Sequence, residues 1–382
     1  MTAATNFDLE TQAEPELAGR VLRDKYQLIR PIGEGGMGIV WIAHNRVLDV
    51  AVAVKLSRHH AGPESSRTAE RALTEARLAA QLTHPAVCRV VDYGTTEEGE
   101  PFVVSELLQG QNLAEALARK KRLSPVRAVQ TILPILDALE AAHAHGIVHR
   151  DVKPSNIFLA RDVGERIQPK LLDFGIAQPM NARKSWPDSL LLGTPCYMSP
   201  EQARGDEVDF RSDIWSACVA LYELLTGSVP FVGEDYVATI EQVTRATPAP
   251  ITDLASGDVL LSRIVMRGLE KEPSARWASA NELALELARW LVSHGESEDA
   301  SGQLLRARFG ETAPVQLLTP AFGRPVQTFP GLELPHIRPA TTIIRPRRSS
   351  MVGSVRAATP RGLIALAALL SLLGCGAWLA GR

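Results

Sequence analysis

The sequence predicts an α+β fold of two lobes, followed by a linker and a C-terminal membrane helix. Short apolar runs typical of buried strands dominate up to residue 108, whereas runs with a helical period dominate between residues 113 and 294. Seven prolines then interrupt every periodic pattern between residues 314 and 346. Finally, 18 uncharged and mostly apolar residues follow at 363–380.

Composition sets limits on the class of protein. The chain has 382 residues, a net charge of -2 and 45% hydrophobic residues, as expected of a globular domain with an appendage. This near-neutral charge argues against a nucleic-acid partner. The 4 cysteines lack C-x-x-C spacing, which favours a reducing compartment over a disulfide framework or a zinc site. The start carries no basic segment followed by an apolar run, so we expect most of the chain to be cytoplasmic.

The individual elements follow from local patterns. Residues 1–22 are polar and are predicted to be a disordered leader, and 23–294 are predicted to form the two-lobed domain. Strands are predicted from Tyr26 onward, at Val50–Val54 and at Phe102–Leu108. Helices are predicted at Thr68–Leu82, where His84-Pro85 ends the pattern, and at Leu113–Lys120, Pro125–His145, Ser212–Gly227 and Leu283–His294.

A glycine-rich stretch, GEGGMGIV at 33–40, joins two predicted strands. Glycines have no Cβ atom, so the backbone can lie close over phosphate groups and direct N–H groups at their oxygens. The stretch also fits the loose G-x-G-x-x-G of dinucleotide sites, but those sites run from a strand into a helix. Alone, this motif leaves a functional loop and an ordinary hairpin equally open.

Lys55 ends the apolar strand at residues 50–54, where its ammonium group can reach a ligand under the glycine loop. A lysine that snorkels at a strand end is the more common alternative. Glu75 on the next predicted helix favours the functional interpretation, because its carboxylate can pair with Lys55 and fix its direction. Glu70 is the second candidate for that pairing.

Two further strings supply the groups that phosphoryl transfer needs. Within HRDVKPSN at 149–156, Asp151 can accept a hydroxyl proton, Lys153 can neutralise the γ-phosphate and Asn156 can ligate Mg²⁺. Asp173 begins D-F-G after an apolar pair and offers a second oxygen ligand. Either string alone could be a simple polar turn. Both together, downstream of the loop and the lysine, favour a catalytic site.

Taken together, these motifs resemble the protein-kinase signature, and the resemblance covers Tyr26 to Leu291. It continues in GTPCYMSPE at 193–201, which resembles the substrate-positioning segment and in which Cys196 is expected to be exposed and open to oxidation, or simply incidental. The chain is similar to bacterial serine/threonine kinases of the eukaryotic type. The resemblance implies the two-lobed protein-kinase fold and a buried ion pair between Glu201 and Arg276.

The same resemblance assigns roles to single residues. It implies catalytic roles for Asp151, Lys153, Lys55 and Glu75, and ligation of Mg²⁺, with Mn²⁺ as a substitute, by Asn156 and Asp173. It places Ser105 as a small gatekeeper before the hinge, unless the register slips by one residue to Val104. The residues implied to contact ATP are Gly33, Glu34, Gly35, Gly36, Met37, Gly38, Val40, Ala53, Lys55, Ser105, Glu106, Leu108 and Phe158.

Three functions compete at this point: an active Ser/Thr kinase, a pseudokinase scaffold and a small-molecule phosphotransferase. No catalytic residue type is missing, which disfavours the pseudokinase, and Lys153 with Thr194 resembles Ser/Thr kinases rather than Tyr kinases. The expected partners are protein substrates with Ser or Thr acceptors and a second copy of the chain for autophosphorylation. Arg150 resembles an arginine that receives a loop phosphate, which makes Ser185 and Ser189 the candidate regulatory sites.

The C-terminal part predicts a membrane anchor. Residues 295–362 read as a Pro/Arg-rich linker, with no acidic residue after Glu333. Residues 363–380 would span about 27 Å as a helix, just enough for a hydrocarbon core. Arginines precede this segment, so the positive-inside rule predicts a single-pass protein of the cell (inner) membrane with a cytoplasmic kinase. A helix buried in the core is the alternative.

Overall fold

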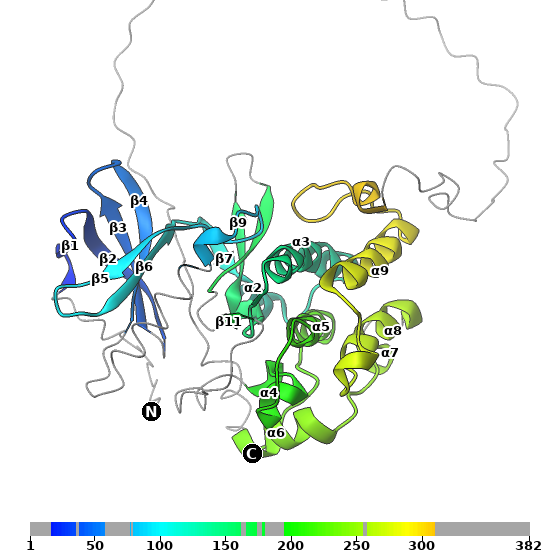
Figure 1. Ribbon diagram of the computed structural model, residues 1–382. Helices are drawn as coiled ribbons and strands as arrows, with labels where there is room; N and C mark the ends of the chain where they lie inside the picture. The colour runs from blue at the N-terminus through cyan, green and yellow to red at the C-terminus, as the bar shows by residue number, and fades with distance from the viewer. Residues whose placement is uncertain are drawn as a thin grey trace, which may run out of the picture. The chain divides into compact units, whose positions relative to one another are not determined.

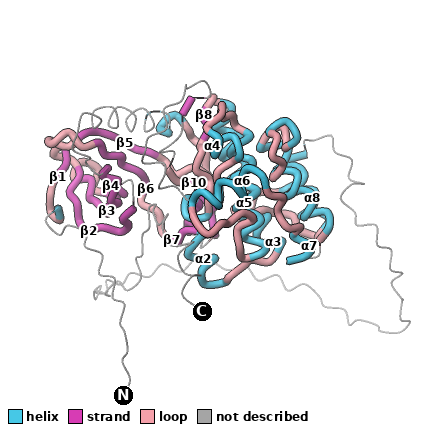
Figure 2. Tube along the Cα trace, turned by 90° about the horizontal axis from the view of Figure 1, so that it is seen from below, coloured by secondary structure: helices cyan, strands magenta, loops and turns pink. Residues whose placement is uncertain are grey.

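The computed structural model describes residues 17–35, 38–57, 77, 79–161, 166–173, 178–179, 195–254 and 258–309. All of these belong to one of the two compact units of the chain, whereas the other unit, Pro314–Leu363, lies outside the described residues. Strands gather in an N-terminal lobe and helices in a C-terminal lobe (Figures 1 and 2). The predicted order of a strand-rich half before a helix-rich half is therefore confirmed.

The N-lobe is a six-stranded antiparallel sheet with the order β1-β2-β3-β4-β6-β5. The predicted strand at 102–108 is shorter than expected, since β6 ends at Glu106 and the chain then leaves the sheet. The strands of this sheet are β1 (Val21–Leu22), β2 (Tyr26–Gly35), β3 (Gly38–Asn45), β4 (Val50–Ser57), β5 (Val90–Thr95) and β6 (Pro101–Glu106).

Successive side chains of these strands alternate between two cores, as the period of two requires. Trp41, Val54 and Phe102 lie in a core on one face of the sheet, and all three are at most 1% exposed. Val40 and Ala53, each next to one of these residues in sequence, lie in a separate apolar cluster that also contains C-lobe residues. The second face of the sheet therefore lines the space between the lobes.

The C-lobe is helical, and within the described residues two short sheets, β10-β9-β7 and β11-β8, lie beside it. The predicted helix at 113–120 is found with those bounds, and the predicted helix at 283 begins three residues earlier, because Ser279 caps it through the Glu282 N–H. The helices are α2 (Leu113–Lys120), α3 (Pro125–Ala144), α4 (Pro200–Arg204), α5 (Arg211–Thr226), α6 (Tyr236–Arg245), α7 (Ile251–Leu254), α8 (Val259–Gly268) and α9 (Ala280–Ser293). The short strands are β7 (Gly110–Asn112), β8 (Ile147–Val148), β9 (Ile157–Arg161), β10 (Ile167–Leu171) and β11 (Gln178–Pro179).

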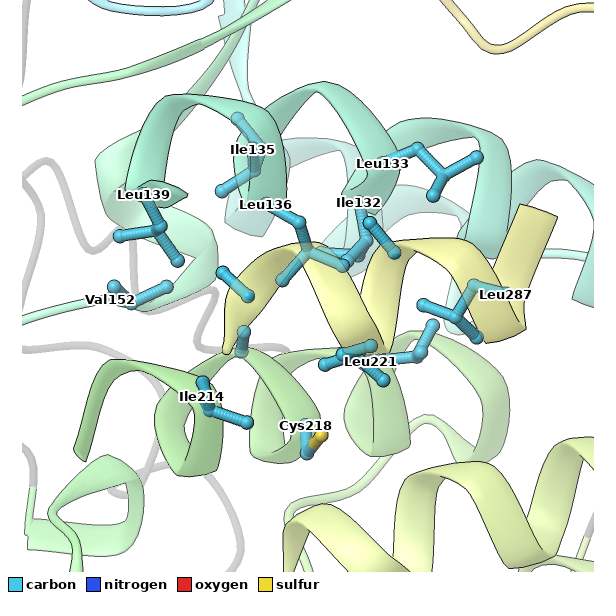
Figure 3. Packing of buried hydrophobic residues seen from close by; sticks show 14 of the residues in the cluster. Ile132, Leu133, Ile135, Leu136, Leu139, Val152, Ile214, Cys218, Leu221 and Leu287 are labelled. Carbon is cyan, nitrogen blue, oxygen red and sulfur yellow. The ribbon is translucent and has the colours of Figure 1, made fainter. Parts of the chain in front are cut away.

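Helix α3 is the centre of the C-lobe core. Figure 3 shows Ile132 and Leu136 on the side of α3 that faces α9 and α5, near Leu221 and Leu287. All four side chains are fully buried. Packing of this apolar surface stabilises α3 far more than helix propensity does, and it fixes the helix that leads into the catalytic loop.

The folded chain continues past the predicted domain boundary at residue 294. Residues 295–309 end in a short 3-10 helix, η6 (Leu305–Phe309), whose Leu305 is fully buried in the C-lobe core. In the described ranges no helix has the length and hydropathy that a membrane crossing needs. The predicted linker from residue 310 onward and the predicted membrane helix at 363–380 lie outside the described residues.

Candidate active site

An apolar cluster joins the N-lobe sheet to strand β9 of the C-lobe. It brings together Val40, Ala53, Leu108 and Phe158, which the resemblance implied as ATP contacts. Each of the four is at most 5% exposed. Apolar side chains that meet from both lobes in this way can cover the two faces of a flat heterocycle. Ala160 and Leu172 in this cluster, and Ile32 and Cys88 at its edge, were not predicted from the sequence.

The strand register places Ser105 on the sheet face that carries this apolar cluster. Ser105 pairs with Ala53 across β4 and β6, and residues paired in this way point to the same face of the sheet. Val104 lies in the other core and is fully buried, so the one-residue slip is excluded. The Ser105 hydroxyl hydrogen-bonds the Cys88 thiol, and burial raises the pKa of Cys88 to about 12. Two small polar side chains, Ser105 and Cys88, therefore border the apolar cluster.

This arrangement predicts that Ser105 controls access for bulky adenine analogues. An analogue with a large aromatic substituent should inhibit the natural chain, and Ser105→Met should weaken that inhibition by about tenfold or more, since the buried aromatic group is worth a few kcal/mol. The measurement is inhibitor potency at matched ATP saturation, with Ser105→Thr as the small-residue control. Equal potency against the natural chain and Ser105→Met would contradict the prediction.

The glycine-rich stretch forms a hairpin between β2 and β3. Gly33 pairs with Val40, Glu34 with Ile39 and Gly35 with Gly38. Gly38 has a φ of +143°, and a Cβ atom there would lie 2.0 Å from the Leu56 carbonyl oxygen, so a side chain cannot be accommodated. The strand-to-strand connection favours a phosphate-covering loop over a dinucleotide fingerprint. Gly36 and Met37, at the tip, lie outside the described residues.

Lys55 reaches the metal-binding candidate Asp173. The Lys55 Nζ atom lies 3.0 Å from Asp173 Oδ1, and the side chains are 18% and 21% exposed. Asp173 has a φ of +51°, a conformation that costs a non-glycine residue energy and that its surroundings must hold. Lys55 of the N-lobe and Asp173 of the C-lobe are thus neighbours, a contact that the sequence did not predict. Glu75 and Glu70, the predicted partners of Lys55, lie outside the described residues.

The catalytic-loop residues converge on the Asp151 carboxylate. Lys153 Nζ lies 2.9 Å from Asp151 Oδ2, and the Asn156 amide donates to the same oxygen at 2.8 Å. Asn156 also donates to the Asp151 carbonyl oxygen at 2.8 Å. Since both side chains hold one carboxylate oxygen, the orientation of Asp151 is fixed. The carboxyl group is 23% exposed and so remains accessible to a substrate hydroxyl.

Asp213, at the start of α5, binds the backbone of the catalytic loop. Its carboxylate accepts the backbone N–H groups of His149 at 2.9 Å and Arg150 at 2.7 Å, and His143 Nε2 lies 2.8 Å away. Burial alone would raise the pKa of Asp213, but the hydrogen bond from His143 and the neighbouring His149 lower it below its ordinary value. A buried carboxylate that stays ionised can hold Arg150 at its positive φ of +67°. No local pattern in the sequence predicts this role of Asp213.

The chemistry of the donor set fits a hard divalent cation. The Asn156 amide nitrogen is committed to Asp151, which leaves the amide oxygen as an acceptor. Asp173 follows β10, and its backbone is held because His149 Nε2 contacts the Leu172 carbonyl oxygen at 2.9 Å. These residues, Asn156 and Asp173, are the ones that would hold Mg²⁺. When bound there, the ion would neutralise charge on the transferring phosphoryl group.

The segment 195–201 differs from expectation in one respect. Cys196 is 1% exposed, so the expectation of an exposed and oxidisable thiol is wrong. The segment then enters α4, whose Ser199 and Gln202 form a capping box. Gln202 Nε2 also donates to the Arg150 carbonyl oxygen at 3.0 Å, which joins this segment to the catalytic loop. Gly193 and Thr194 lie outside the described residues.

Comparison with known proteins identifies the family. The protein kinase domain matches residues 26–298. The chain is 37% identical over 286 residues to the serine/threonine-protein kinase pkn3 of Myxococcus xanthus, covering 73% of this chain and 52% of pkn3. It is 36% identical to the probable serine/threonine-protein kinase PknB of Corynebacterium glutamicum, covering 70% of this chain and 42% of that protein.

Among solved structures, the kinase domain of Mycobacterium tuberculosis PknI is similar in fold. The TM-score is 0.55 with 24% sequence identity, and the match covers 70% of this chain and 95% of that domain. The chain spans about half of the length of pkn3 and less of PknB.

The fold, the site and these comparisons define a protein kinase. The chain belongs to the protein kinase family, and within it to the bacterial serine/threonine kinases of the eukaryotic type. Members of this family use ATP and Mg²⁺.

Proposed function

We propose that this protein transfers the γ-phosphoryl group of ATP to serine and threonine hydroxyls of proteins, its own chain included. The observation that carries the proposal is the Asp151 carboxylate, fixed by Lys153 and Asn156, together with the contact between Lys55 and Asp173 across the lobes. A pseudokinase requires none of these groups to be oriented together.

Each residue has a defined task in this reaction. The substrate hydroxyl donates its proton toward Asp151 as its oxygen attacks the γ-phosphorus, and the bond to the β-phosphate oxygen breaks to release ADP. Lys153, next to Asp151, neutralises charge on the γ-phosphate. Lys55 holds the phosphates that stay with ADP. Positioning and charge, rather than covalent chemistry by the protein, therefore account for the rate.

The direct test is phosphate transfer with the full-length protein and Mg·ATP, followed by mapping of the sites. We expect phosphoserine and phosphothreonine on protein acceptors and on the chain itself, with Ser185 and Ser189 as the expected self-modified positions. Asp151→Asn should lower transfer by about 100-fold or more, because the proton acceptor is lost. Transfer to small molecules alone would favour the phosphotransferase alternative. Undiminished transfer by Asp151→Asn would reject the assignment.

We also propose that the protein is anchored in the cell membrane with the kinase in the cytoplasm, where a homodimer permits autophosphorylation. Support comes from the 18 uncharged residues at 363–380 and the arginines that precede them. In fractionated cells the full-length chain should sediment with membranes and need detergent for release. A chain that ends at residue 309 should appear in the soluble fraction. Full-length chain that is soluble without detergent would reject the anchor.

A further inference from the structure

Helix α3 contains a proline that leaves one of its carbonyl groups without a helical partner. Pro134 lies in the middle of Pro125–Ala144 and has no N–H group, so it cannot donate to the carbonyl oxygen of Gln130, four residues earlier. The lost bond lies within a helix that is buried along most of its length. A buried carbonyl without a donor costs about 1–3 kcal/mol, so the position needs another donor.

The donor comes from residues 295–309, which we call the C-terminal extension. The backbone N–H of Ala300 donates to the Gln130 carbonyl oxygen at 3.1 Å. The Gln130 side chain, 8% exposed, in turn donates to Glu296 Oε2 and to the Glu298 carbonyl oxygen, both at 3.1 Å. Residue 130 is thus bonded to the extension through both its backbone and its side chain.

A second attachment lies two turns further along α3. Arg308 donates to both carboxylate oxygens of Asp137, with Nη2 2.6 Å from Oδ2, and to Asp299 at 3.2 Å. The Arg308 side chain is 8% exposed and that of Asp299 is fully buried. Asp299 also accepts the N–H groups of Ser301 and Gln303, which closes the turn that presents Ala300. In the sequence, Leu305 lies between the residues of the two attachments, and its side chain is fully buried.

Near its C-terminal end, helix α3 carries His143, which supports the catalytic loop. His143 lies six residues after Asp137, about 9 Å along the helix axis, and its ring contacts Asp213 at 2.8 Å. Asp213 holds the backbone of His149 and Arg150, directly before the catalytic Asp151. A change in the path of α3 would therefore reach the catalytic loop through one side-chain contact.

We propose that residues 296–309 form a clamp that completes α3 and so positions the catalytic loop. Arg308, Ala300 and Gln130 are positioning residues in this proposal. Most of the clamp, Asp299–Phe309, lies beyond the 26–298 match to the protein kinase domain. The structural part of the proposal stands on these contacts alone, and its effect on turnover rests on the proposed kinase function.

The test compares full-length Arg308→Met with full-length Arg306→Met, an exposed arginine on the same 3-10 helix. Arg308→Met should lower Tm by about 5 °C, because it leaves Asp137 and buried Asp299 without their cation. Amide exchange in α3 should accelerate by about tenfold. Below both melting temperatures kcat should fall by about tenfold, with KM for ATP nearly unchanged. Arg306→Met should change none of these quantities.

A second variant tests the role of the proline. Pro134→Ala returns an N–H group to the helix, so the Gln130 carbonyl depends less on the clamp. The loss of α3 protection caused by Arg308→Met should then shrink to less than half. An equal loss in both backgrounds, or equal behaviour of Arg308→Met and Arg306→Met, would overturn the clamp. A lower Tm with unchanged kcat would overturn its effect on catalysis. If the natural chain transfers no phosphate, the proposed function fails, while Tm and amide exchange still test the clamp.

Discussion

Lys55→Met is expected to abolish phosphate transfer while leaving the fold intact. Lys55 ends β4 with its Nζ atom 3.0 Å from Asp173. Removal of one preorganised cation of this kind costs about 100- to 1000-fold in kcat. Methionine keeps the length and the apolar stem of the side chain, so packing against the strand should persist. The measurement is kcat for phosphate transfer at saturating ATP.

The control for this variant is stability. The ion pair is partly exposed, at 18% and 21%, so its loss should lower the free energy of unfolding by no more than about 1 kcal/mol. A second control, Lys25→Met, removes an N-lobe lysine that pairs with Asp92 at 2.7 Å and lies over the ring of Tyr26, a residue of the core on the other face of the sheet. It should leave kcat unchanged. Turnover near that of the natural chain in Lys55→Met would refute the assigned role.

The sequence predicted those residues whose roles follow from short motifs. Asp151, Lys153 and Asn156 lie within six consecutive residues, so their meeting requires only one loop. Ser105 could be placed because a strand fixes alternate faces, and the pairing with Ala53 shows the expected face. In these cases the local geometry of one loop or one strand determines where the side chains lie, so the prediction needs little knowledge of tertiary packing.

The sequence could not predict contacts that depend on distant segments. Asp213 lies 64 residues from His149, and no local pattern shows that it accepts the loop backbone. Leu172 is the second residue of an apolar pair and lies directly after β10, and only the packing of both lobes assigns it to the apolar cluster. The clamp was predicted to be the start of a linker, because its turn-rich sequence shows no hydrophobic period of two or of 3.6 residues. Leu305 is the single core residue of the clamp, and one apolar residue is too weak a hydrophobic pattern to predict that a segment is folded.

The buried pair of Glu201 and Arg276, implied by resemblance, is present with bidentate geometry. The two N–H···O distances are both 2.7 Å, and the side chains are 4% and 0% exposed. Arg276 also donates to the carbonyl oxygens of Glu270, Arg211 and Lys271. Its guanidinium carbon lies 5.0 Å from the centre of the Trp215 ring. One side chain thus joins α4, α5 and the turn before η5 (Pro273–Ala275).

Arg276→Met is therefore expected to destabilise the C-lobe by about 3–5 kcal/mol, because it leaves the Glu201 carboxylate buried without a partner. The measurement is urea unfolding, read as a shift of the midpoint at constant m. The control is Arg245→Met, which removes an exposed i,i+4 pair with Glu241, with side chains 79% and 64% exposed, and should cost at most about 0.5 kcal/mol.

A double variant separates the lost attraction from the stranded charge. Glu201→Gln removes the charge but keeps an acceptor for Arg276, so alone it should cost less than Arg276→Met. In Glu201→Gln/Arg276→Met no buried carboxylate remains, and the loss should be smaller than the sum of the two single losses. Strict additivity would show that Glu201 is not stranded in the single variant. A loss in Arg276→Met no larger than in Arg245→Met would show that the pair does not hold the C-lobe together.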